Sequence, residues 1–128
     1  MEINTITGLI PDTCIKIHTE LGPGLFESVY EEVAEYVLVK EKGLYVERQK
    51  AVPVIYQGIK MNDGFRLDLL VERKVVVEIK SVELLAPVHY KQILTYLKLV
   101  NLKDGILINF NVDLLKDGFH RVFNNHVK

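Results

Sequence analysis

The stretch FRLDLLVERKVVVEIKS, from Phe65 to Ser81, decides the fold that we expect of this chain. Two apolar segments rich in branched residues flank the charged break ERK at positions 72–74. This is the pattern of a β-hairpin whose turn lies at the charged residues. Each strand also carries charge where a buried strand should have none. Asp68 interrupts the first strand, and Glu78 and Lys80 lie at the end of the second.

The parity of this hairpin decides whether the charges meet. Glu78 and Lys80 share one face because strand side chains repeat every two residues. If Arg73 is at the centre of the turn, Asp68 lies opposite Glu78 and on the same face. A turn of even length would place Asp68 on the other face, unless a bulge restored it. We expect the first of these registers.

Two carboxylates and an ammonium group at the end of a hydrophobic sheet are costly to bury without a partner. Packed carboxylates also repel each other, so at least one should have a raised pKa. A hard divalent cation is the obvious partner, because Asp68 and Glu78 supply the oxygen ligands that it takes. Lys80 is then free to orient a nucleophilic water or to stabilise a charged transition state. An ordinary antiparallel hairpin with a cross-strand salt bridge would contain the same residues, so the pattern alone leaves both interpretations open.

Length and composition fit a single globular domain over residues 1–128. A chain of 128 residues is long enough for one hydrophobic core, and its 48% hydrophobic and 26% charged residues give no bias towards disorder. The single cysteine, Cys14, excludes an internal disulfide and a cysteine-rich zinc site. No segment has the pattern of a membrane span or a signal peptide, so we expect a cytoplasmic protein. The net charge of −1 does not by itself indicate nucleic-acid binding, although a local basic patch could provide it.

The periodicity of the apolar residues predicts three helices and a mixed β-sheet. Gly22, Pro23 and Gly24 separate the first two helices, and Pro11 either kinks the first or marks its first turn. A hairpin followed by a strand–helix–strand crossover is typical of the α/β or α+β class, here a mixed sheet flanked by helices. We expect helices over 6–21, 25–42 and 85–100, and strands over 45–56, 59–71 with a break at 62–64, 75–80, 106–110 and 120–123. We expect a loose tail over 124–128.

Polar residues on two of these helices are further candidates for a site. Glu27 and Tyr30 lie three residues apart, on neighbouring parts of one helix face. The helix dipole also favours a carboxylate in a first turn, so Glu27 does not require a functional role. In the helix at 85–100, Ile93 and Leu97 are expected to be buried against the sheet. The side chains of Gln92 and Tyr96 lie next to this buried face, and we expect them to border either a cleft or solvent.

The chain resembles the GxxExxY proteins of the PD-(D/E)XK nuclease superfamily. The name-giving motif is GLFESVY at 24–30, and the superfamily motif corresponds to Asp68 and to EIK at 78–80. The helix with Gln92 and Tyr96 also matches, so the resemblance extends over about residues 18–123. The glycine-turn motif is fairly specific to this family, whereas the aspartate and the EIK segment alone are not. One departure is that Leu67, not proline, precedes Asp68, at a position that is variable in the superfamily.

The resemblance implies a restriction-endonuclease-like fold, and metal-dependent phosphodiester cleavage in active members. It implies that Asp68 and Glu78 bind Mg²⁺ or Mn²⁺, together with the Ile79 carbonyl. Lys80 would position the attacking water or stabilise the charged phosphorus centre, and Glu27 would bind a second metal ion or its water. The supporting residues of this site would be Tyr30, Gln92 and Tyr96.

Nuclease activity is the function that the complete set of Asp68, Glu78 and Lys80 favours, because a degenerate binding protein would have less reason to hold all three. The alternative is a non-catalytic nucleic-acid-binding or protein-interaction module on a nuclease-like fold. The net charge of −1 and the small size favour that alternative. The expected partner is a nucleic acid, with DNA the first choice. The fold also allows a homodimer, by analogy with nucleases that need two sites for two strands.

Overall fold

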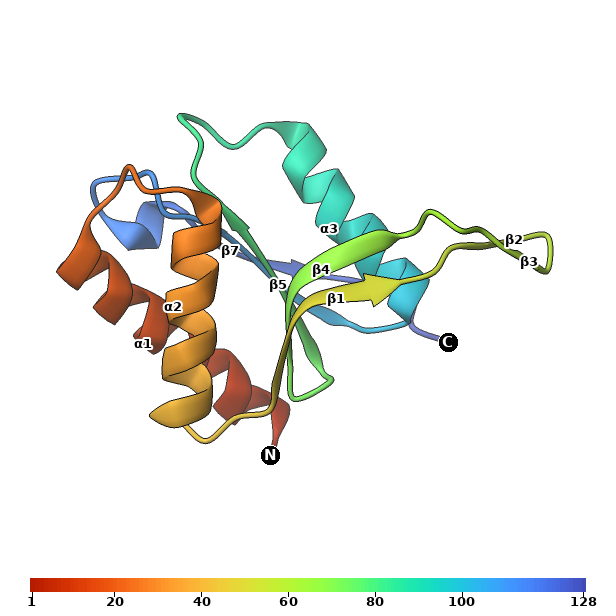
Figure 1. The fold of residues 1–128 in the computed structure, drawn as a ribbon, viewed down its shortest axis with the longest axis horizontal. Coiled ribbons are helices and arrows are strands. Elements are labelled where there is room, and N and C mark those ends of the chain that lie inside the picture. The colour runs from red at the N-terminus through yellow and green to blue at the C-terminus, as the bar shows by residue number, and fades with distance from the viewer.

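The computed structural model describes all residues from Met1 to Lys128 as a mixed sheet with helices on both faces (Figure 1). The helices are α1 (Ile3–Leu21), α2 (Glu27–Lys40) and α3 (Pro87–Val100), with a 3-10 turn η1 (Leu115–Asp117), and the strands are β1 (Val46–Val52), β2 (Ile55–Tyr56), β3 (Ile59–Lys60), β4 (Phe65–Val71), β5 (Val75–Lys80), β6 (Asp104–Asn109) and β7 (Phe119–Phe123). The main sheet has the order β1-β4-β5-β6-β7. Only the β5–β6 pair is parallel, and α3 makes the crossover between these two strands. None of the helices combines the length and the hydropathy needed to cross a bilayer.

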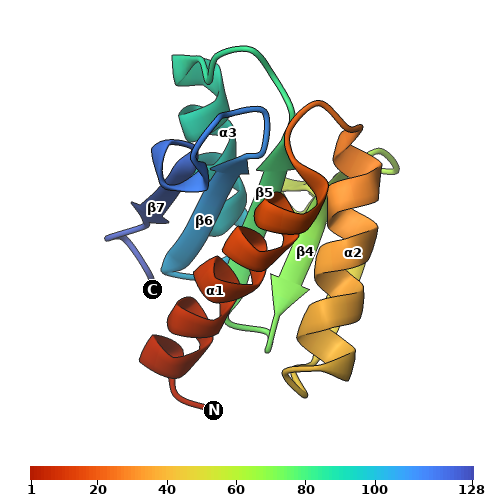
Figure 2. The same ribbon diagram turned by 90° about the vertical axis from the view of Figure 1, so that its left-hand side faces the viewer.

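Two hydrophobic cores lie on the two faces of the sheet. The larger joins α1 and α2 to one face, and the smaller joins α3 to the other (Figures 1 and 2). Ile93 and Leu97 are fully buried in the smaller core, which confirms the predicted inner face of α3. Gly105 in β6 permits this close packing, because a Cβ atom there would lie only 2.9 Å from Leu97 Cδ1.

The hairpin predicted from residues 65–81 forms between β4 and β5. Its register pairs Val71 with Val75, so Arg73 is at the centre of the turn, as predicted. Glu72 and Arg73 have positive φ angles of 53° and 55°. Positive φ at two successive residues is the geometry of the mirror-image turns that fit the twist of a hairpin. The odd-length turn expected from the sequence is therefore confirmed.

The side-chain alternation of β4 breaks at Asp68. Leu69 belongs to the core under α1 and α2, but Leu67 belongs to the core under α3. Residues two apart in a regular strand share a face, so β4 must twist sharply between these two leucines. The pairing of β4 with β5 ends at Leu69, and β4 then runs with β1 alone towards the projecting β2–β3 hairpin (Figure 1). The sheet therefore opens between β4 and β5 at Asp68.

Four predicted segments differ from the structure. The strand predicted over 59–71 divides at its predicted break into β3, in the projecting β2–β3 hairpin, and β4, in the main sheet. The strand predicted over 45–56 ends at Val52 and resumes as β2 in the separate hairpin, because Pro53 has no N–H for the ladder. Helix α1 begins at Ile3 and continues through Pro11, which therefore lies in its interior and not in its first turn. The tail predicted to be loose is tied down at its start, because Asn124 is buried and its side chain donates to the Leu102 carbonyl.

The substitution Leu97→Ala should lower the free energy of unfolding by about 2–5 kcal/mol, because it leaves a cavity between α3 and the sheet. Leu97 is fully buried, whereas Leu99 on the same helix is 48% exposed. Leu99→Ala is therefore the control and should change the free energy of unfolding by no more than about 0.5 kcal/mol. Urea denaturation of both variants measures the difference, and equal effects would mean that the faces of α3 are assigned wrongly.

Candidate active site

Asp68 and Glu78 are held together at the point where β4 and β5 separate. The Glu78 Oε2 atom accepts a hydrogen bond of 2.8 Å from the N–H of Asp68. In return, Asp68 Oδ2 accepts one of 2.8 Å from the N–H of Ile79. Each carboxylate thus satisfies a backbone donor next to the point where the pairing of β4 with β5 ends. We call these two side chains the carboxylate pair. One oxygen of each is used by the backbone, and the other faces no backbone donor.

The surroundings of the carboxylate pair disfavour two negative charges. Burial, followed by the charge of Asp68, raises the pKa of Glu78 to about 8. Burial also raises the pKa of Asp68 to about 6, and the charges of Glu31 and Glu27 add to this effect. The hydrogen bonds from the N–H groups of Ile79 and Asp68, and then the Lys80 ammonium group, oppose these shifts in pKa without cancelling them. The site is therefore short of positive charge, as expected for carboxylates packed together.

Lys80, Gln92 and Tyr96 lie beside the carboxylate pair. Lys80 Nζ is 3.5 Å from Gln92 Oε1, which links the end of β5 to α3 at the limit of hydrogen-bond length. The Tyr96 ring stacks on Phe65 with the two centroids 4.3 Å apart. Burial, and then the negative charges of the carboxylate pair, raise the pKa of the Tyr96 hydroxyl. Helix α3 therefore contributes two polar side chains to the opening between β4 and β5.

Glu27 is close to the carboxylate pair but binds a different partner. It is the first residue of α2, and its Oε2 atom accepts a hydrogen bond of 3.1 Å from the N–H of Ser81. Ser81 directly follows Lys80 at the end of β5, and its hydroxyl donates to the Leu25 carbonyl at 2.7 Å. These two bonds tie the start of α2 to the end of β5.

Tyr30 supports the site only through the turn that precedes Glu27. Its side chain is fully buried in the larger core and stacks on Phe110 with the centroids 4.3 Å apart. The Tyr30 hydroxyl donates to the Gly22 carbonyl at 2.6 Å and accepts from the N–H of Leu25 at 3.1 Å. Gly22 has a φ angle of 75°, in the region that favours glycine. The spacing of the motif at 24–30 therefore reflects these two hydrogen bonds of the Tyr30 hydroxyl, which we call the clasp at Tyr30.

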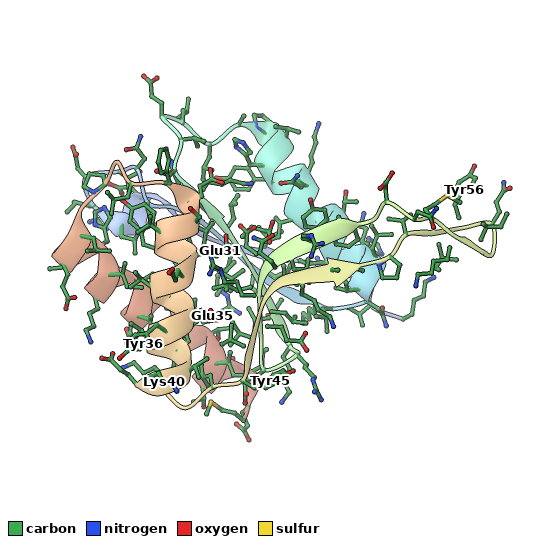
Figure 3. The ribbon with its side chains drawn as sticks, in the orientation of Figure 1. Glu31, Glu35, Tyr36, Lys40, Tyr45 and Tyr56 are labelled. Carbon is green, nitrogen blue, oxygen red and sulfur yellow. The ribbon has the colours of Figure 1, made fainter.

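Glu31, Arg48 and Gln49 belong to the same cluster but were not selected from the sequence. Glu31 is 4% exposed and lies on the side of α2 that faces β1 (Figure 3). Its Oε1 atom accepts from Arg48 Nε at 3.2 Å and from Gln49 Nε2 at 2.6 Å. One signal was present, because Glu31 lies one helical turn after Glu27. Gln49 could be found only from the register that places it opposite Asp68.

A divalent cation fits the carboxylate pair, although three carboxylates do not converge. No group of three or more His, Cys, Asp or Glu side chains comes close enough to hold a metal ion. Mg²⁺, however, usually binds proteins through one or two carboxylates and keeps several waters. Asp68 and Glu78 offer this number of ligands, each with an oxygen that no backbone N–H uses. The donor set and the shortage of positive charge therefore both suit a hard cation.

The raised pKa of Glu78 predicts that stability depends on pH in the absence of metal. The pKa rises from an ordinary 4.5 to about 8 on folding, so folding favours the protonated form. The contribution of Glu78 to the free energy of unfolding is therefore fully present below about pH 4.5 and is lost as the pH rises through about 8. Glu78→Gln should remove most of this dependence, whereas Glu83→Gln, at an exposed position, should not. Chemical denaturation across this pH range measures the slope, and identical slopes for wild type and Glu78→Gln would contradict the assignment.

Comparison with known proteins agrees with this geometry. The family model of the PD-(D/E)XK nuclease superfamily matches residues 4–122, which is nearly the whole chain. No match was found among curated proteins or among solved structures. The mixed five-stranded sheet with flanking helices is consistent with the restriction-endonuclease-like fold of the superfamily and confirms the predicted fold class. The chain therefore belongs to the PD-(D/E)XK nuclease superfamily.

Proposed function

We propose that this protein is a nuclease that hydrolyses phosphodiester bonds of nucleic acids with Mg²⁺ or Mn²⁺. The observation that carries the proposal is the placement of the two carboxylates: Glu78 accepts from the N–H of Asp68, and Asp68 accepts from the N–H of Ile79. Lys80 lies at the end of the same strand as Glu78. Membership of the superfamily supports a nuclease-like function for the chain. Hydrolysis of a phosphodiester needs charge stabilisation at phosphorus and an activated water, and these residues suit both tasks.

Each residue has a role that follows from its position. Asp68 and Glu78 would hold the cation through the oxygens that the backbone does not use. The cation would supply charge neutralisation at the phosphate and a more acidic water. Lys80 would orient the attacking water or stabilise the charged phosphorus centre. The remaining proposed contributors are Glu27, for a second ion or its water, and Gln92 and Tyr96, which would orient Lys80 and the substrate.

The proposed substrate is contacted mainly along its sugar–phosphate backbone, because the residues named above act on the phosphodiester itself. Such binding should weaken as the salt concentration rises. DNA is the first substrate to test, and the cytoplasm is the proposed location. The motif at 24–30 supports a place among the GxxExxY proteins within the superfamily. A homodimer would supply a second site for the second strand of a duplex.

Cleavage assays on three variants test the proposal. Purified protein is incubated with single- and double-stranded DNA and RNA, each with Mg²⁺, Mn²⁺ or a chelator. Wild type should cut at least one substrate, and only with metal. Lys80→Ala should abolish turnover but retain Mn²⁺ binding, because a charged lysine is not a ligand, whereas Asp68→Asn should lose both. Lys74→Ala, in the exposed turn at the other end of β5, is the control and should cleave like wild type.

Two outcomes would count against the proposal in different ways. Cleavage that survives Asp68→Asn would mean that the activity comes from a contaminant or from another part of the chain. Absence of cleavage with either metal, together with nucleic-acid binding that does not depend on Lys80, would favour the non-catalytic module. Two observations favour the non-catalytic module: the net charge of −1 and the lack of a three-carboxylate cluster.

A further inference from the structure

Gln49 has an unusual backbone conformation at the centre of β1. Its φ angle is 52°, in the left-handed region that a glutamine in a strand rarely adopts. The residue lies between the pairs Arg48–Leu69 and Lys50–Leu67, so it is opposite Asp68 in the neighbouring strand. Backbone strain of this kind persists only where the surrounding structure holds it in place.

The side chain of Gln49 connects α2 to the carboxylate pair. Its Nε2 atom donates to Glu31 Oε1 at 2.6 Å and lies 3.4 Å from Asp68 Oδ1. A glutamine amide has two N–H groups, so one side chain can serve both acceptors. Glu31 is a firm anchor, because it is 4% exposed and its Oε1 atom also accepts from Arg48 Nε at 3.2 Å.

Asp68 is consequently contacted on both of its oxygens. Oδ2 accepts from the N–H of Ile79 on β5, and Oδ1 faces the Gln49 amide on β1. These contacts come from the two strands on either side of β4, so together they fix the rotation of the carboxylate about its own axis. The contact at Oδ1 is long, which leaves that oxygen able to accept a further ligand.

We propose that Gln49 is a positioning residue that orients Asp68 for metal binding and is itself anchored by Glu31. The proposal deepens the proposed function, because it rests on Asp68 as a ligand. A backbone requirement alone does not explain the residue. Glycine adopts positive φ without strain. If the φ angle were the only requirement at position 49, glycine would therefore be the more stable residue there. The amide is the part of Gln49 that glycine cannot replace.

The test compares Gln49→Gly with Gln57→Gly. Gln57 also has a positive φ angle, 51°, but lies in the turn of the projecting β2–β3 hairpin. Both substitutions relieve the same backbone strain, and only the first removes the amide that faces Asp68. Two quantities are measured in full-length protein: hydrogen exchange of the Ile79 amide without metal, and the dissociation constant of Mn²⁺ by calorimetry.

In Gln49→Gly we expect the Ile79 amide to lose protection while the amides of β6 keep theirs, because the acceptor Asp68 becomes mobile. We also expect the Mn²⁺ dissociation constant to rise about 10-fold, as for other groups that orient a metal ligand. Gln57→Gly should match wild type in both measurements. A merely structural role would loosen β5 and β6 together, or leave Mn²⁺ affinity unchanged.

The two measurements separate this proposal from the function on which it rests. Wild-type protection of Ile79 in Gln49→Gly would overturn the positioning role, whether or not Mn²⁺ binds. If wild type binds Mn²⁺ and Gln49→Gly binds it with the same dissociation constant, the positioning role is overturned as well. If wild type binds no Mn²⁺ but Ile79 loses protection in Gln49→Gly, Gln49 still positions Asp68 and the proposed metal-dependent function is the part that fails.

Discussion

The exchange of hydrogen bonds between the carboxylate pair and the opposite strands is the interaction on which the site depends. The pairing of β4 with β5 ends at Leu69, and beyond it the N–H groups of Asp68 and Ile79 donate to the two carboxylates. An unsatisfied buried donor costs about 1–3 kcal/mol, so the opening needs acceptors at these two positions. The Asp68 and Glu78 carboxylates supply them. The gap in the sheet and the placement of two negative charges are therefore a single structural feature.

The rest of the molecule supports this feature from both faces of the sheet. On one side, the buried Glu31 of α2 reaches β1 through Gln49, and the clasp at Tyr30 sets the start of the same helix. On the other side, Gln92 of α3 meets Lys80 at the end of β5. Burial in two hydrophobic cores holds these helices in place, but it also raises the pKa of both members of the carboxylate pair. The packing that stabilises the fold therefore also disfavours the negative charges of Asp68 and Glu78, which a bound cation would neutralise.

Local patterns were enough to predict the hairpin and its parity. The break at 72–74 has odd length, and the register that it sets points Asp68 towards Glu78, although the pairing of the two strands ends one residue earlier, at Leu69. Gln49 could not be predicted in this way, because its importance depends on the pairing of β1 with β4 and on a φ angle that glutamine does not favour. Tyr30 belongs to the predicted site only through the resemblance to the family motif at 24–30, whereas its own side chain is fully buried in the larger core. Pro53 indicated an edge or a bulge, but its position alone does not show that the chain leaves the sheet.

The most direct test of the account is the anomalous scattering of Mn²⁺ in crystals grown or soaked with saturating metal. The account predicts one peak beside Asp68 and Glu78 in the wild-type protein, and no peak there in Asp68→Asn. A wild-type crystal without a peak at the carboxylate pair would contradict the account. A peak that persists unchanged in Asp68→Asn would contradict it equally, because the cation would then be held by other residues.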